Sequence, residues 1–186
     1  NNLNILINNS GATWGEKLGK FPYSAWNKVL DVNVTGLFQL TQSLLSVLEN
    51  SSKCGDPSRI INIGSVMGST PHGDGAYSYS ASKAAVHHLT RILAKELGPR
   101  NITVNAFAPG PFESKMTKFA FSSKIKEKAM ANSIPLKRTG RPQDIASATL
   151  YLCGKGGGYV TGTIIPLDGG IHISTGHELF EAAKNN

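Results

Sequence analysis

The sequence predicts an α/β domain in which helices cover both faces of a doubly wound parallel sheet. Four short apolar runs are typical of buried strands and lie at residues 3–7, 59–63, 102–108 and 163–167. Longer stretches with apolar residues at helical spacing lie between them, at residues 24–49, 79–97 and 142–153. Strands that alternate with helices in this way form parallel sheets, because parallel neighbours need a long crossover connection.

The first helical stretch, residues 24–49, carries a start signal and an interruption. Ser24 is the expected N-cap, because its hydroxyl can accept a hydrogen bond from a free N–H of the first turn. The β-branched residues Val34 and Thr35 precede Gly36, and this run is expected to disturb the helix.

The other helices have clearer ends. The stretch at residues 79–97 stops at Gly98-Pro99, which is a helix-stop signal. The stretch at 142–153 begins with Pro142, which suits the first turn of a helix. Residues 111–133 are expected to be irregular or helical.

Composition and charge exclude several other classes of protein. The 186 residues are 40% hydrophobic, which suits one folded domain, expected at residues 1–171 with a polar tail at 172–186. Two cysteines, Cys54 and Cys153, are too few for a disulfide framework or a multi-cysteine zinc site. No apolar run reaches the roughly 18 residues of a membrane span. The net charge of +7 is spread along the chain, so we expect a soluble cytoplasmic protein, with an organelle left open, and no nucleic-acid partner.

The ends of the predicted strands point to a binding site. Ligands of parallel α/β sheets bind beyond the carboxyl ends of the strands. Three strands end in polar or glycine-bearing turns, at residues 8–11, 64–65 and 109–110. Turn chemistry explains any one of these endings, but together they favour a site at one edge of the sheet.

Tyr79 and Lys83 are the main candidates for chemistry at this edge. They are four residues apart at the start of a helix, so both side chains lie on one face. An ammonium beside a phenol lowers the pKa of the phenol toward the range useful for acid–base catalysis. Ser65 ends the preceding strand and could present its hydroxyl to the oxygen that Tyr79 protonates. By spacing alone, an ordinary surface pair of tyrosine and lysine is the more common explanation.

Other reactive residues are weaker candidates. Ser65, His72 and Asp74 have the residue types of a nucleophilic triad, but no nucleophile elbow surrounds the serine. His87 and His88 lack partners at metal-ligand spacing, so they are expected to be packed or solvated, and no metal site is predicted.

An ordered set of motifs resembles the short-chain dehydrogenase/reductase family. Residues 79–83, YSASK, resemble its YxxxK motif, and Asn8-Asn9-Ser10-Gly11 resembles its NNAG turn with serine in place of alanine. Further similarities are Asn33, the strand end Asn62-Ile63-Gly64-Ser65, the PG motif within residues 105–110, and the DGG that closes residues 162–170. Each is weak alone, but the set follows the family order over about residues 3–171. The resemblance implies a Rossmann-like fold, of which about four strands and the carboxyl-terminal two thirds are present.

The resemblance implies catalytic roles for Asn33, Ser65, Tyr79 and Lys83. Tyr79 would exchange a proton with the substrate oxygen, and Ser65 would orient the carbonyl. Lys83 would hold the nicotinamide ribose and lower the pKa of Tyr79. Asn33 would anchor a water that passes protons to Lys83, through backbone groups freed by the helix disturbance. Without the family, packing inside the helix is the better explanation for Asn33.

The resemblance also implies a nicotinamide cofactor. It would contact Tyr79 and Lys83 together with Asn9, Gly11, Pro109, Gly110, Phe112 and Ser114. Asn9 would lie along the adenosine side, and Phe112 and Ser114 would contact the carboxamide; packing of a lid residue on the core is the alternative for Phe112. NADP is the expected cofactor. NAD is left open, because the family's glycine-rich phosphate turn and its specificity residue, which normally precede the NNAG turn, are absent from this sequence.

Within the family, residues 76–89 and 109–117 resemble the 3-oxoacyl-(acyl-carrier-protein) reductases of rhamnolipid biosynthesis. The implied activity is reduction of a ketone group in a small molecule or in an acyl thioester. The substrate would be covered by a lid at residues 111–135. A sugar or alcohol dehydrogenase of the same family is one alternative, and a truncated chain that folds without catalysis is another. The resemblance implies a homodimer or homotetramer formed through the two long helices.

Overall fold

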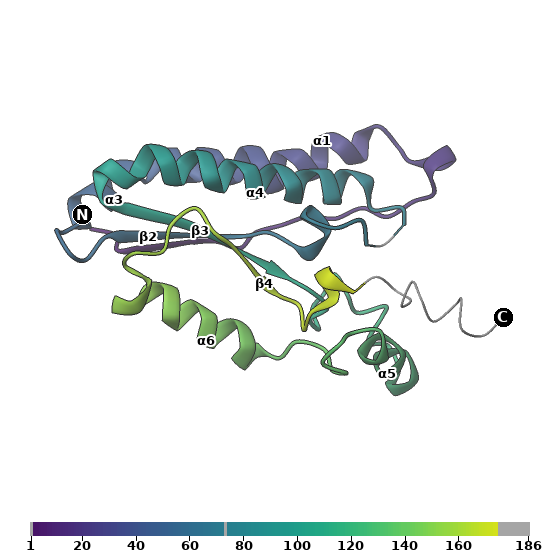
Figure 1. Cartoon of the computed structure of the whole chain (residues 1–186). Helices are drawn as coiled ribbons and strands as arrows, with labels where there is room; N and C mark the ends of the chain where they lie inside the picture. The colour runs from purple at the N-terminus through teal and green to yellow at the C-terminus, as the bar shows by residue number, and fades with distance from the viewer. Residues whose placement is uncertain (1, 73, 175–186) are drawn as a thin grey trace.

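The computed structural model describes residues 2–72 and 74–174. These residues form a parallel sheet with helices on both faces (Figure 1). The strands are β1 (Ile5–Asn8), β2 (Ser58–Ile63), β3 (Ile102–Pro109) and β4 (Ile164–Leu167), and they lie side by side in chain order. The predicted fold class is therefore confirmed, with strand ends that differ from the expected ones by two residues or fewer.

The helices are distributed unequally between the two faces of the sheet. Their bounds are α1 (Ser24–Leu30), α2 (Leu37–Ser43), α3 (Leu45–Ser51), α4 (Tyr77–Leu97), α5 (Lys124–Asn132) and α6 (Pro142–Cys153). The helices α1 to α4 cover one face, and α6 packs on the other (Figure 1). Among the described residues, no helix has both the length and the apolar character needed to cross a bilayer.

The first helical stretch is interrupted where the sequence predicts a disturbance. A π-helix over Asp31–Gly36 separates α1 from α2, and α3 ends at Ser51 rather than at residue 49. The expected N-cap is wrong, because Ser24 is already inside α1 and Tyr23 precedes it without a side-chain cap. Tyr23 itself has helical backbone angles, so this helix start lacks the extended N-cap residue whose side chain would accept from the first turn.

The longest helix, α4, begins at Tyr77, two residues earlier than expected, and ends before Gly98 as predicted. The segment at residues 111–133 contains α5, whose N-terminus is capped by the Ser123 hydroxyl accepting from the backbone N–H of Lys126. Cys153 lies at the end of α6 and is half-buried.

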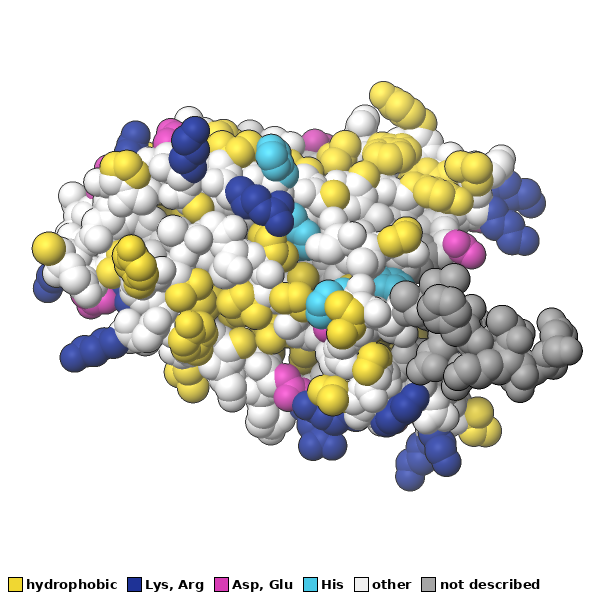
Figure 2. Space-filling model, viewed as in Figure 1, with side chains coloured by type: hydrophobic (Ala, Val, Ile, Leu, Met, Phe, Trp, Pro, Cys, Tyr) yellow, Lys and Arg dark blue, Asp and Glu magenta, His cyan; other side chains and the backbone are white. Residues whose placement is uncertain are grey.

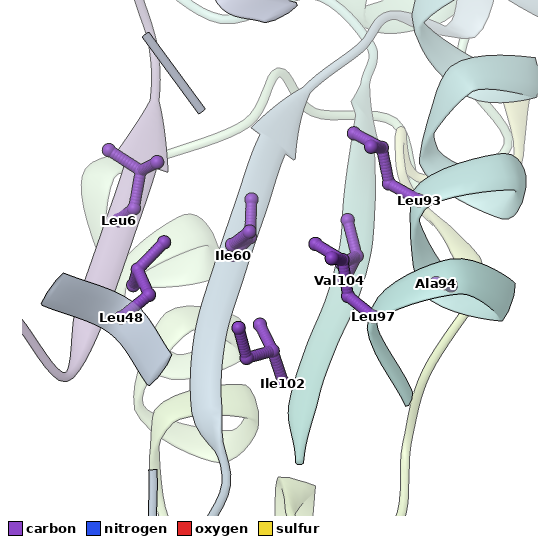
Figure 3. Close-up of a cluster of buried hydrophobic side chains, with 8 residues drawn as sticks. All are labelled: Leu6, Leu48, Ile60, Leu93, Ala94, Leu97, Ile102 and Val104. Carbon is purple, nitrogen blue, oxygen red and sulfur yellow. The ribbon is translucent and has the colours of Figure 1, made fainter. Parts of the chain in front are cut away.

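Two apolar clusters hold these layers together. The larger lies between the sheet and the helices α3 and α4 and is drawn in Figure 3; it consists of Leu6, Leu48, Ile60, Leu93, Ala94, Leu97, Ile102 and Val104. The second lies on the opposite face of the sheet and is centred on Ile61, Phe107 and Leu152. Ile60 and Ile61 are adjacent in β2, so their side chains point to opposite faces of the sheet. Both are fully buried, because each face is covered by one of the two clusters.

The edge strand β1 departs from the expectation that helices cover both faces of every strand. Leu6 is buried, whereas Ile5 and Ile7 are 41% and 42% exposed. Within residues 2–72 and 74–174, α6 packs with the second cluster under β2 and β3, and that cluster does not include β1 residues. On the face seen in Figure 2, Lys and Arg side chains are dispersed around the surface rather than gathered in one stripe.

A buried polar network ties the carboxyl ends of β1 and β2 to the helices. The Asn8 amide donates to Asn62 Oδ1 at 2.9 Å and to Thr41 Oγ1 of α2 at 3.1 Å. The Asn62 amide in turn donates to Thr90 Oγ1 of α4 at 2.9 Å. Since Asn62 and Thr90 are fully buried, these bonds replace lost contacts with water.

Replacing Thr90 by valine is expected to lower the free energy of unfolding by about 1–3 kcal/mol, because the buried Asn62 amide loses an acceptor. Urea unfolding measures this change. The matched control is Thr149→Val: Thr149 is half-buried, and its hydroxyl donates to the Ile145 carbonyl of its own helix. A loss of less than about 0.5 kcal/mol is expected there. Equal losses in the two variants would contradict a structural role for the network.

Candidate active site

Ser65 lies two residues beyond the end of β2, rather than at the strand end where it was expected, and it opens the loop toward α4. It is buried, and its hydroxyl accepts a hydrogen bond from the backbone N–H of Met67 at 3.2 Å. This bond caps a single turn of 3₁₀-helix, Val66–Gly68. The side chain is therefore held by its own loop at the carboxyl edge of the sheet.

This loop lies directly against α4. A Cβ atom added to Gly68 would come within 2.7 Å of the backbone carbon of Lys83, so only glycine allows the approach. The contact brings the loop that carries Ser65 to the first turns of α4, where Tyr79 and Lys83 lie.

Lys83 is 4% exposed, and a single backbone carbonyl accepts from it within the described part of the chain. Its Nζ donates to the backbone carbonyl of Ile63, the last residue of β2, at 2.7 Å. The same Nζ lies 5.6 Å from the centroid of the Tyr79 ring. Burial lowers the pKa of Lys83 to about 8, because the ammonium is poorly solvated.

Tyr79 differs from the expectation in the direction of its pKa shift. Burial raises the pKa of Tyr79 above its usual value, and a side-chain hydrogen bond with Ser65 lowers it by a smaller amount. Loss of solvation of the phenolate therefore outweighs the polar contacts of the phenol in the free protein.

Asn33 lies in the π-helix with both sides of its amide occupied. Its Oδ1 accepts from the backbone N–H of Ala12 at 2.7 Å, and its Nδ2 donates to the Ala12 carbonyl at 2.9 Å. The same nitrogen donates to Ser82 Oγ at 2.8 Å, and Ser82 donates to the Tyr79 carbonyl. Asn33 thus joins the turn after β1 to the helix that carries Tyr79.

The turn residues expected to contact a cofactor line the same edge of the sheet. Gly11 lies beside the buried groups, because an added Cβ would be 3.5 Å from Asn33 Oδ1 and 3.7 Å from Lys83 Nζ. Asn9 is exposed just after β1. Pro109 ends β3, and Gly110 packs so closely on Asp168 that an added Cβ would lie 2.7 Å from its side chain.

Phe112 and Ser114 have contacts of another kind. The Phe112 ring covers Gly140, where an added Cβ would lie 2.3 Å from the ring, which agrees with the packing alternative. The Ser114 hydroxyl is exposed and bonds to Thr117 Oγ1 at 3.0 Å within its own loop. Phe112 also lines an open groove of about 850 Å³ beside α5, together with Phe121 and Lys128.

The residues of the triad alternative, Ser65, His72 and Asp74, do not form a hydrogen-bonded triad among the described residues. His72 Nε2 is buried and has no hydrogen-bond partner among the described residues, and Asp74 is exposed. Neither is hydrogen-bonded to Ser65 in the part of the chain that the structure describes. Of the two adjacent histidines, His88 is exposed and His87 is buried against the Ser65 loop.

Sequence reasoning missed the roles of His87 and Gly68 in this contact. His87 continues the spacing of Tyr79 and Lys83 by four more residues, so the periodicity of the helix face was an available signal. Gly68 left no such signal, because its requirement for glycine comes from the close packing of the loop on α4, which the sequence of the loop does not show.

The donor set fits a nicotinamide cofactor. A lysine ammonium has three N–H donors, and among the described residues only the Ile63 carbonyl accepts from Lys83. The remaining donors of this buried cation match the vicinal hydroxyls of a ribose. Gly11 leaves room for a ligand to approach Lys83, since a side chain at that position would lie against its Nζ.

Comparison with known proteins gives a consistent result. A family profile described as Enoyl-(Acyl carrier protein) reductase matches residues 1–172. The chain is 46% identical over 171 residues to the Rhamnolipids biosynthesis 3-oxoacyl-(acyl-carrier-protein) reductase of Pseudomonas aeruginosa, covering 92% of this chain and 67% of the relative. It is 40% identical over 169 residues to a 3-oxoacyl-(acyl-carrier-protein) reductase of Aquifex aeolicus, covering 91% and 65%.

Solved structures agree with the sequence relatives. An active-site complex of Pseudomonas aeruginosa RhlG with NADP has a TM-score of 0.89 and 46% identity, covering 92% of this chain and 67% of that one. A gluconate 5-dehydrogenase from Burkholderia cenocepacia, solved with NADP and tartrate, has a TM-score of 0.85 and 25% identity, covering 94% and 66%. The chain spans about two thirds of the length of these proteins. The fold, the sequence identity and the ordered motifs together show that this chain belongs to the short-chain dehydrogenase/reductase family.

Proposed function

We propose that this protein reduces a ketone to an alcohol with a nicotinamide cofactor, and that Tyr79 donates the proton. The observation that carries the proposal is the meeting of Ser65, Tyr79 and the buried Lys83 at the carboxyl edge of the sheet. Among related proteins, names such as 3-oxoacyl-(acyl-carrier-protein) reductase support this reaction class and favour a 3-oxoacyl thioester as substrate.

The chemistry divides between the carbon and the oxygen of the carbonyl. When bound, the nicotinamide supplies the hydride that adds to the carbonyl carbon. Tyr79 Oη donates its proton to the carbonyl oxygen, so the C=O bond becomes an alcohol. The Ser65 hydroxyl donates a hydrogen bond to the same oxygen and stabilises the negative charge that develops there. The high pKa of Tyr79 keeps the phenol protonated at neutral pH, as a proton donor requires.

Lys83 and Asn33 support this proton transfer. Lys83 would hold the ribose hydroxyls and place a positive charge near the phenolate that forms on Tyr79. The Asn33 side chain already makes three hydrogen bonds to Ala12 and Ser82. A water relay to Lys83 would therefore use the backbone groups of the π-helix rather than the Asn33 amide.

The cofactor would extend along the turns that end the strands. We assign Asn9 to its adenosine side, Gly11 to the space beside Lys83, and Pro109 and Gly110 to its nicotinamide side. Phe112 and Ser114 are assigned to the carboxamide end, which requires the loop at residues 112–117 to turn toward the ligand. NADP is the proposed cofactor because related structures are described with NADP bound, and NAD is the alternative.

Two alternatives are kept. Similarity to a gluconate 5-dehydrogenase favours a sugar or alcohol dehydrogenase, in which the same residues act in the reverse direction. The other alternative is a chain that folds without catalysis. Isothermal titration of the 186-residue chain with NADPH separates the enzyme from the non-enzyme: micromolar binding supports the enzyme, and no heat of binding supports the alternative.

We also propose that the chain forms a homodimer or homotetramer through its helical layer. Large apolar side chains are exposed on this layer, with Phe38 and Leu40 of α2 at 41% and 46% and Ile92 of α4 at 47%. Light scattering measures the mass directly, and a monomer at micromolar concentration would contradict the proposal.

Replacing Tyr79 by phenylalanine is expected to lower kcat by about 10²–10⁴-fold, because the proton donor is lost. The assay is NADPH consumption with a 3-oxoacyl thioester, and binding of NADPH is expected to change little. The matched control is Tyr77→Phe, because Tyr77 is exposed and packs edge-on against Phe21. Equal rates for wild type and Tyr79→Phe would contradict Tyr79 as the proton donor.

Replacing Lys83 by methionine is expected to change how stability depends on pH. Between about pH 8 and pH 10.5 the unfolded chain binds more protons at this site than the folded chain, so the stability contributed by Lys83 rises with pH. Relative to Lys83→Met, the unfolding free energy of the wild type is expected to rise by about 3 kcal/mol between pH 7 and pH 10.5. Urea unfolding at several pH values measures it.

The matched control for this experiment is Lys95→Met, because Lys95 lies exposed on the same helix. Its difference from the wild type is expected to stay nearly constant over this range of pH. Parallel stability curves for the wild type and Lys83→Met would contradict a buried, poorly solvated ammonium at position 83.

A further inference from the structure

The third residue on the face of α4 that carries Tyr79 and Lys83 is a buried histidine. His87 follows Lys83 by one helical turn and is 3% exposed. Its ring contacts the loop after β2 at two points. The backbone N–H of Ser65 donates to His87 Nε2 at 3.4 Å, and Ser69 Oγ lies 3.2 Å from His87 Nδ1.

These two contacts determine where the ring carries its proton. A backbone N–H can only donate, so His87 Nε2 must offer its lone pair to Ser65. In a neutral ring the proton then lies on Nδ1, which donates to Ser69 Oγ. Burial, together with the nearby charges of Arg91 and Lys83, lowers the pKa of His87 to about 4, so the ring is neutral near pH 7.

The fit between the ring and the loop is close. A Cβ atom added to Gly64 would lie 2.2 Å from His87 Nε2 and 2.8 Å from the carbonyl of Phe107. The Gly64 N–H donates to that carbonyl at 2.8 Å. The backbone that leads into Ser65 is therefore held between β3 on one side and the His87 ring on the other.

We propose that His87 is a positioning residue that fixes the Ser65 hydroxyl through the backbone of its loop. The inference rests on the proposed role of Ser65 at the substrate carbonyl. His87 does not itself reach the reacting atoms; it supplies the acceptor for the buried Ser65 N–H and a rigid surface under Gly64. Without that acceptor the N–H is left unpaired, and the loop shifts to recover a partner. A displacement of about 1 Å at a positioned group can cost about 10²-fold in rate.

The kinetic test compares two substitutions of similar size. His87→Leu removes the acceptor and is expected to lower kcat about 10–100-fold, with the KM for NADPH unchanged. His87→Gln places an amide oxygen near the position of Nε2 and is expected to recover most of that loss. The matched control is His88→Leu, because His88 is exposed on the same helix, and it is expected to behave as wild type.

A double-mutant cycle with Ser65→Ala separates positioning from general packing. If His87 acts through the Ser65 hydroxyl, His87→Leu is expected to have little further effect on kcat once that hydroxyl is gone. Full additivity of the two losses, or equal loss in His87→Gln and His87→Leu, would overturn the proposal.

A spectroscopic measurement tests the same arrangement without turnover. In the wild-type chain labelled with ¹⁵N-histidine, the His87 ring is expected to show a protonated Nδ1 and an unprotonated Nε2 at pH 7. In Ser69→Ala, which keeps the bulk of the ring contact, this preference is expected to weaken. A His87 ring protonated on Nε2 would overturn the inference. If the ring shows the expected tautomer but the chain has no reductase activity, only the proposed function is contradicted.

Discussion

The close packing of the loop after β2 on the first turns of α4 is the contact on which the candidate site depends. Gly68 lies against the Lys83 backbone, and Gly64 lies against the His87 ring, at distances that a methyl group would not allow. This approach also lets the Ile63 carbonyl reach Lys83 Nζ. A larger side chain at either glycine would separate the strand end from the helix, and with it Ser65 from Tyr79 and Lys83.

The same packing has an electrostatic consequence. It places an ammonium and a phenol where water is scarce, so the pKa of Lys83 falls and that of Tyr79 rises. Both shifts favour the neutral side chains in the free protein. An oxygen-rich ligand that accepts from Lys83 would restore the solvation that burial removed, so the buried cation provides a physical reason for ligand binding.

Sequence patterns predicted the features that depend on neighbours along the chain. Apolar runs located the four strands, Gly98-Pro99 located the end of α4, and the four-residue spacing placed Tyr79 and Lys83 on one face. Features that depend on distant segments were not predictable in this way. The exposure of Ile5 and Ile7 depends on what covers β1, and the direction of the Tyr79 pKa shift depends on how deeply the helix is packed. His87 has the right spacing, but its contact with Ser65 exists only when loop and helix meet.

Asn33 shows how a local irregularity serves the assembled site. The sequence indicated a disturbance in the helix, and the π-helix that forms there turns the Asn33 amide toward the backbone of Ala12. The second N–H of that amide reaches Ser82, whose hydroxyl donates to the Tyr79 carbonyl. A continuous chain of hydrogen bonds therefore runs from the turn after β1 to the helix that carries the tyrosine. Both N–H donors and one oxygen lone pair of the Asn33 amide are engaged in this chain, so a water relay of the kind proposed for residue 33 would use its backbone groups.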